Sequence, residues 1–267
     1  MASRNFFKTL RITLLLLMLF FVGMNSWLTQ LRSTDWNEPL WVVVYPVNGD
    51  NSRVSQRYIT DLSPGVFDAI ESFLASEAQR HGQQIREPVT IQLAPQVPES
   101  PPMPPDNGST LSVMLWSLKL RYWAWRNDTF KGPQPDVQMF VVYYDPETHS
   151  RLRHSLGLRK GMIGVVNAYA GSSMAQRNNV VIAHEFLHTV GASDKYDMAS
   201  NQPHYPEGYA EPHRTPLYPQ RKAEIMGGRI PLSEHDAVMP ASVAKAGATY
   251  GSFSACFIMA CMTFLFL

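Results

Sequence analysis

The sequence predicts an α/β fold with a small mixed sheet, a central helix and an irregular C-terminal part. Four runs have the apolar or alternating character of strands, and they lie at 40–47, 89–93, 136–144 and 161–170. A helical run that is apolar nearly all round follows over 173–190, and such a helix is expected to be buried. Residues 195–222 are then rich in Pro, Tyr and His with little periodicity, which is typical of irregular structure.

The remaining elements are predicted from local signals. Ser63 followed by Pro64 is typical of a helix start, and this helix is expected to run to about Arg80. Ser109 or Thr110 is expected to cap a second helix through Trp125. One face of this second helix carries Leu111, Met114, Leu115, Leu118, Tyr122 and Trp125. Its aromatic and basic end suggests either core packing, which we prefer, or a place near a membrane surface.

Composition excludes several classes of function. The chain has 267 residues and a formal net charge of +1, so it is long enough for one sizeable domain and gives no reason to expect nucleic acid as a partner. Both cysteines, Cys256 and Cys261, lie in the apolar tail. The region between the two termini therefore has no disulfide and no cysteine metal ligand, a composition common in bacterial periplasmic domains.

The two termini suggest membrane segments. Arg4, Lys8 and Arg11 precede an uncharged apolar run that extends to Leu31, which predicts an uncleaved signal anchor, with a cleaved signal as the alternative. Residues 246–267 carry no charge and predict a second transmembrane helix, with a buried C-terminal helix as the alternative. The predicted organisation is an anchor at 1–31, a domain at 32–245 and the tail. The domain is expected on the periplasmic side of a bacterial inner membrane.

The central helix carries a pattern of metal ligands. His184 and His188 are four residues apart, so both imidazoles can face one zinc ion from the same side of a helix. Glu185, beside the first of them, is placed to take a proton from an attacking water. The ordinary alternative is a pair of histidines that satisfy each other on an apolar helix.

A catalytic zinc needs a third protein ligand and an open position. Gly191 suits the helix C-terminus, where a left-handed residue turns the chain, and this turn can bring Asp194 back towards the metal. A Glu from a second helix is the rival arrangement, but prolines interrupt the region that holds Glu207 and Glu211. His204 and His213 stay open as other third ligands.

The pattern His184-Glu185-x-x-His188-x-x-Gly191-x-x-Asp194 resembles the zinc signature of the metzincin clan, with aspartate as third ligand, as in small bacterial secreted members of the snapalysin type. Ala223–Gly228 resembles the Met-turn of that clan, although Gly228 stands where some members have a Tyr. The resemblance covers about residues 160–230. It implies that Met226 supports the site from below without binding metal.

The resemblance also implies how a substrate would be held. In metzincins the sheet before the metal helix has an exposed edge that pairs with an extended peptide, and Gly161–Ala168 is the candidate segment here. The irregular part would form the wall of the specificity pocket. A developing oxyanion would take a hydrogen bond from one of Tyr196, Tyr205, Tyr209 or Tyr218.

A loop before the fourth strand is strongly basic. Its cations are Arg151, Arg153, His154, Arg159 and Lys160. Such a loop could steer an acidic substrate or contact lipid head groups, and a solvated loop is the ordinary alternative.

Together these observations predict a membrane-anchored zinc endopeptidase acting on a protein or peptide. His184, His188 and Asp194 would bind Zn²⁺ and Glu185 would be the general base. The second hypothesis is a membrane-tethered binding or assembly protein with a structural zinc, although such a site has no need of Glu185. A zinc hydrolase acting on a non-peptide bond is the third.

Overall fold

The computed structural model describes residues 7–17, 20, 24, 39–105, 108–159, 161–249 and 252. Its centre is a five-stranded sheet in the order β2-β1-β3-β5-β4. The strands are β1 (Leu40–Asn48), β2 (Val89–Leu93), β3 (Val137–Tyr144), β4 (Leu156–Leu158) and β5 (Ile163–Tyr169). The strands run parallel except β4, which pairs antiparallel with β5. The predicted α/β fold with a small mixed sheet is confirmed.

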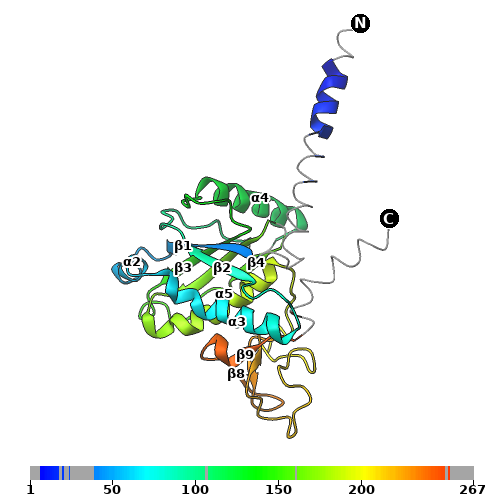
Figure 1. Ribbon diagram of the computed structural model, residues 1–267. Coiled ribbons are helices and arrows are strands. Elements are labelled where there is room, and N and C mark those ends of the chain that lie inside the picture. Colours follow the sequence, from blue (N-terminus) through cyan, green and yellow to red (C-terminus); the bar gives the residue numbers. More distant parts are fainter. Residues whose placement is uncertain are drawn as a thin grey trace.

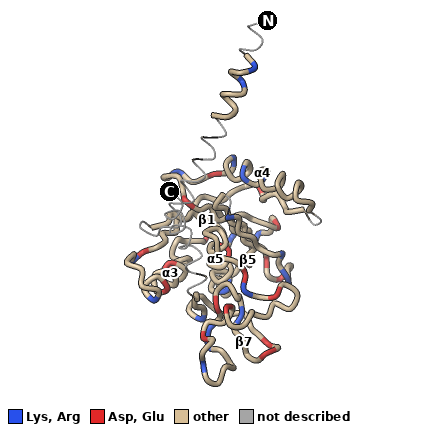
Figure 2. Tube along the Cα trace, turned by 90° about the vertical axis from the view of Figure 1, so that its right-hand side faces the viewer, with Lys and Arg blue, Asp and Glu red and all other residues tan. Residues whose placement is uncertain are grey.

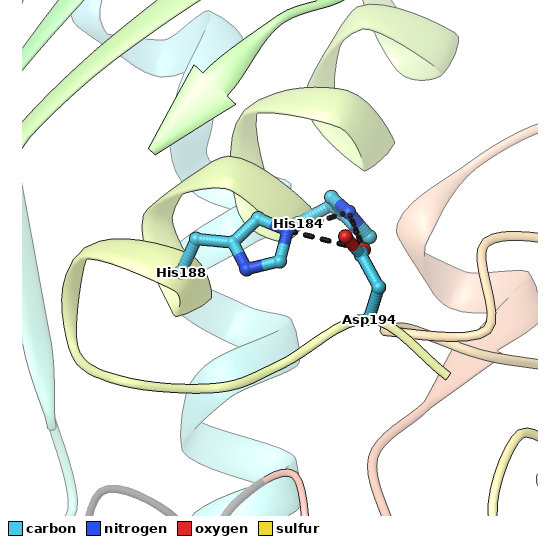
Figure 3. A group of neighbouring side chains, drawn as sticks. All are labelled: His184, His188 and Asp194. Atoms are coloured by element: carbon cyan, nitrogen blue, oxygen red, sulfur yellow. Dashed lines mark hydrogen bonds and ion pairs between the residues drawn. The ribbon is translucent and has the colours of Figure 1, made fainter. Parts of the chain in front are cut away.

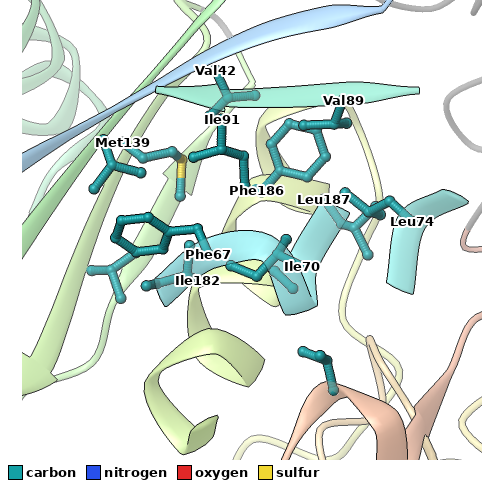
Figure 4. Close-up of a cluster of buried hydrophobic side chains, with 14 of the residues drawn as sticks. Val42, Phe67, Ile70, Leu74, Val89, Ile91, Met139, Ile182, Phe186 and Leu187 are labelled. Carbon is teal, nitrogen blue, oxygen red and sulfur yellow. The ribbon is translucent and has the colours of Figure 1, made fainter. Parts of the chain in front are cut away.

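Helices cover both faces of this sheet (Figure 1). Along β1, Val42 and Val44 join the core with α3 (Asp68–Arg80) and α5 (Ala175–Thr189), which Figure 4 shows in close-up. Val43 and Tyr45 point the other way and pack with α4 (Thr110–Arg126). Successive strand residues face opposite sides, so both faces must be apolar when both are covered. This explains why β1 is a continuous apolar run.

The helix starts differ in detail from the prediction. A 3₁₀ segment, Pro64–Phe67, precedes α3, and another, Ser172–Met174, precedes α5. Neither start has a side-chain cap hydrogen bond, so Ser63 marks a helix start without capping it through its side chain. One helix was not predicted: α2 (Arg53–Thr60), which Ser52 caps by accepting a hydrogen bond from the Ser55 backbone N–H. Because α2 is mostly polar, its sequence has too few apolar residues to indicate a helix.

The expectation of core packing for the end of α4 is only half right. Trp123 is buried, with 8% of its surface exposed, whereas Trp125 is 74% exposed. The predicted apolar face, Leu111 to Trp125, is exposed over most of its length. The buried stripe is instead Leu120, Trp123 and Ala124, which have helical i, i+3, i+4 spacing. The apolar periodicity of the sequence could not distinguish the buried stripe from the exposed face, because α4 is apolar on several sides.

The region after α5 is irregular, as predicted. Its short strands form two pairs, β6 (Ala223–Glu224) with β9 (Ala246–Gly247), and β7 (Ile230–Pro231) with β8 (Ala237–Val238). The described residues that follow 245 belong to this fold. Ala246 and Ala248 are buried, and the Ala248 backbone N–H donates to Glu77 of α3 at 2.9 Å. The domain therefore extends beyond residue 245.

Within the described part of the chain, no helix combines the length and the apolar character that crossing a membrane requires. On this finding the predicted signal anchor, the transmembrane helices and the membrane-anchored periplasmic location are wrong. Much of both predicted membrane segments, at the N-terminus and at the C-terminus, lies outside the described residues.

Candidate metal centre

The first two predicted ligands come from the last turns of α5, which lies against the sheet. Asn178 fixes this helix by bonding both backbone groups of Tyr169, where β5 ends, at 3.2 and 2.9 Å. His184 and His188 lie one turn apart on the same face, as their spacing predicts. Their Nε2 atoms are 3.1 Å from each other. Two imidazoles therefore converge on one point in space.

The turn after α5 brings the third residue back. Gly191 has φ +110°, its N–H donates to the His188 carbonyl at 3.1 Å, and the Ala192 N–H donates to the Leu187 carbonyl at 2.9 Å. This pair of hydrogen bonds is a Schellman motif, which ends the helix and reverses the chain. Asp194 Oδ1 then lies 3.2 Å from His184 Nε2 and 3.1 Å from His188 Nε2 (Figure 3).

Backbone carbonyls set the orientation of both imidazoles. His184 Nδ1 lies 2.9 Å from the Ile225 carbonyl, and His188 Nδ1 lies 2.9 Å from the Ala192 carbonyl. A carbonyl only accepts, so each Nδ1 is the protonated nitrogen. Both Nε2 atoms, which are left for other partners, consequently face Asp194. This outer hydrogen bond is the usual way in which a metal-binding histidine is fixed in one tautomer.

The arrangement fits a tetrahedral zinc ion. The three facing atoms form a triangle with sides of 3.1 to 3.2 Å. Ligands at about 2.0–2.1 Å from a tetrahedral zinc lie about 3.3–3.4 Å apart. Two lone pairs and a carboxylate oxygen this close repel one another unless a proton or a cation lies between them. Among the described residues, these three form one group with metal-ligand character.

The protonation of the centre reflects this need for positive charge. The pKa of Asp194 is lowered: burial opposes the shift, but hydrogen bonds from His184 and His188 outweigh it. The pKa of His188 is raised, because its hydrogen bonds to Asp194 and to the Ala192 carbonyl outweigh the effect of burial. Both shifts have the same electrostatic cause, which is that positive charge beside the Asp194 carboxylate is favourable. A divalent cation would supply that charge.

Glu185 lies beside this triangle but takes no part in it. Its side chain is buried, and Oε2 has no hydrogen-bond partner within the described structure. Burial raises its pKa, while His184 and His188 act in the opposite direction. A buried carboxylate oxygen without a partner is costly, and such groups concentrate where a protein performs chemistry. Oε2 therefore keeps its capacity to accept a hydrogen bond.

The segment that resembles a Met-turn holds the centre from the other side. The Ile225 carbonyl orients His184, and the Met226 carbonyl accepts from the Lys195 N–H at 3.0 Å, next to Asp194. Glu224, fully buried, accepts from the N–H groups of Gly227 at 2.8 Å and Thr249 at 3.1 Å. Met226 itself is fully buried. The turn therefore positions the His184 imidazole directly. It also holds the segment that carries Asp194, through the neighbouring Lys195.

The edge strand beside the centre is β4, so the segment Gly161–Ala168, which the resemblance suggested for peptide pairing, does not lie at the edge of the sheet. Leu156–Leu158 covers Ile163–Val165, so the β5 edge is already paired there. At Gly157 a Cβ would lie 2.4 Å from the Glu185 carbonyl oxygen and 2.6 Å from His188 Cβ. Only glycine lets the edge strand pack this closely on α5, a feature that the sequence did not reveal.

Gly157→Ala is therefore expected to push β4 away from α5 and to lower the free energy of unfolding by about 1–3 kcal/mol. Denaturant unfolding measures this change. Gly171→Ala is the matched control, because a Cβ there meets Met174 at an ordinary 3.8 Å. Equal stability of the two variants would show that β4 does not depend on this contact.

The other candidates from the sequence lie elsewhere. His204 and His213 are exposed and lie outside the group of three candidate ligands. The Glu211 carboxylate accepts from the backbone N–H of Arg221 at 3.2 Å. Among the tyrosines, Tyr196 lies at the centre, with its ring 6.2 Å from that of His184. Burial and the nearby Asp194 and Glu185 carboxylates raise its pKa to about 12, so its hydroxyl stays a donor. The hydroxyls of Tyr209 and Tyr218 bond each other at 2.9 Å.

Neither a known protein family nor a curated protein matches the sequence. Among solved structures, wild-type OgpA from Akkermansia muciniphila matches with 13% identity and a TM-score of 0.37, covering 81% of this chain and 59% of that chain. A catalytically inactive OgpA in complex with an O-glycopeptide substrate matches with 11% identity and a TM-score of 0.34, covering 84% of this chain and 59% of that chain. This chain therefore spans less than two thirds of the proteins it matches. At these TM-scores the interpretation of the site depends on its own geometry.

Proposed function

We propose that this protein is a zinc-dependent peptidase in which His184, His188 and Asp194 hold the metal and Glu185 is the general base. The observation that carries the proposal is the position of Glu185. Its buried Oε2 has no partner, and Glu185 and His184 line the same cavity of about 470 Å³. A structural zinc site would have no use for a buried carboxylate oxygen without a partner beside two imidazoles.

The residues of the site suit each step of peptide hydrolysis. When bound, zinc would polarise the scissile carbonyl and acidify a water. Glu185 accepts the proton of the attacking water, and its raised pKa lets it hold that proton until the leaving amine takes it. Tyr196 remains protonated, and its hydroxyl, which interacts with Asp194, would turn to donate to the developing oxyanion. The imidazoles stay fixed because each Nδ1 is held by a backbone carbonyl.

The sheet edge supports an extended peptide as substrate. The short strand β4 is the last strand of the sheet and lies against α5, so a peptide that adds to its free edge would pass along the metal-binding helix. Backbone pairing to a sheet edge holds a peptide without regard to its side chains. The side-chain preference must then come from the cavity.

Metal content and cleavage together test this function. We expect the purified full chain to contain one zinc per molecule and to cleave members of a mixed peptide library. A chelator should remove both properties, and added Zn²⁺ should restore both. A folded protein that binds no zinc would exclude the proposal. Stoichiometric zinc without cleavage of any peptide would instead indicate a metal-containing binding protein.

A further inference from the structure

The cavity beside the candidate metal centre is lined by four arginines. Arg151 and Arg153 come from the loop before β4, Arg177 from the first turn of α5, and Arg229 from the segment that follows the Met-turn-like residues. These positions are far apart in sequence and meet only in the folded chain. Figure 2 shows the basic positions along the segments around α5 and β5.

Almost nothing in the described part of the chain neutralises these cations. Glu185 is the only carboxylate in the cavity lining. Across the part of the chain that the structure describes, none of the four arginines forms an ion pair, and Arg229 donates only to a neutral acceptor, the Ala237 carbonyl at 3.3 Å. Charges of one sign around a concave surface raise the local concentration of the opposite charge. The cavity is thus suited to an anion.

The kind of anion follows from the chemistry of the lining. Guanidinium groups bind planar carboxylates through two parallel hydrogen bonds, which gives direction as well as attraction. The cavity of about 470 Å³ lies within the range of about 300–1,000 Å³ of ligand pockets, so it has room for a whole acidic residue. His184 and Glu185 belong to the same lining, so the bound group would lie close to the scissile bond.

Building on the peptidase function proposed above, we propose that this cavity selects substrates by binding a carboxylate next to the scissile peptide bond. That carboxylate is supplied either by the side chain of an Asp or Glu or by the C-terminus of the substrate. Both sources offer the same planar anion to the arginines, and three matched peptides distinguish them.

Binding is measured on the full-length Glu185→Gln protein loaded with zinc, so that hydrolysis does not interfere. The first labelled peptide has an internal Glu and an amidated C-terminus, the second has Gln in its place, and the third has this Gln with a free C-terminus. We expect fluorescence anisotropy to show at least about tenfold tighter binding of the first or the third peptide than of the second. Whichever binds tighter identifies the source of the carboxylate.

The arginines are tested by the double variant Arg177→Gln with Arg229→Gln in the same background. The preference for the carboxylate peptide is expected to fall to about twofold or less. Arg86→Gln is the matched control, since it removes the same charge from an exposed position outside the cavity lining. High salt should weaken the preference as well, because exposed charges are screened.

The results separate this inference from the proposed function. If the wild-type protein cleaves peptides while all three labelled peptides bind alike, the carboxylate inference is overturned and the peptidase function stands. The same conclusion follows if the double variant keeps the full preference. If the wild-type protein cleaves no peptide at all, the function itself is lost.

Discussion

Replacing Glu185 by Gln is expected to leave one zinc per chain and to lower peptide cleavage by about 10²–10⁴-fold, the usual contribution of a general base. Gln has nearly the same shape, so the packing of α5 should hold, but its amide cannot take a proton from water. Zinc should remain because the triangle of His184, His188 and Asp194 does not include residue 185. Metal analysis and initial cleavage rates on the same preparation measure both quantities.

Glu207→Gln is the matched control for this experiment. Glu207 is exposed and lies outside the group of His184, His188 and Asp194. Its replacement by Gln removes the same negative charge. We expect unchanged zinc and unchanged cleavage. Cleavage retained by the Glu185 variant at the wild-type rate would rule out this residue as the base and with it the proposed mechanism.

Replacing Asp194 by Ala is expected to have the largest effect on metal binding. Loss of an outer-shell partner already weakens a metal site about 10–100-fold, and loss of a direct ligand should exceed that. The variant leaves two imidazole Nε2 atoms 3.1 Å apart with no carboxylate between them. Zinc affinity is measured by competition with a chelator of known strength, and cleavage should disappear together with the metal.

His204→Ala and His213→Ala provide the comparison, since both residues were open as third ligands in the sequence. Both side chains are exposed and outside the metal group, so we expect both variants to bind zinc like the wild type. Full zinc affinity in the Asp194 variant would show that another residue is the third ligand. A loss of zinc affinity in one of the histidine variants would then identify that residue.

The helical part of the centre was predictable because its chemistry is local. The spacing of His184 and His188 places them on one face of any α-helix, and Gly191 was recognisable as a helix terminator. The Schellman hydrogen bonds of Gly191 and Ala192 confirm that turn. The assignment of zinc to these residues stays a prediction, which the metal measurements above will decide.

Other predictions failed because apolar composition has more than one cause. The exposed face of α4 and its buried stripe are both apolar, so only the position of the sheet selects Leu120 and Trp123. The apolar N-terminal run suggested a membrane anchor, yet no described helix is long and apolar enough to cross a membrane. Hydrophobicity alone does not say what a segment packs against.

What the sequence determined by itself is set by short-range geometry: the strand runs, the helix that carries His184 and His188, its end at Gly191 and the return of the chain to Asp194. What only the tertiary structure decided involves residues far apart in the chain. The carbonyl of Ile225 orients His184, Gly157 brings β4 against α5, and four arginines from separate segments line one cavity. Such contacts arise when the elements pack together, and no spacing along the chain encodes them.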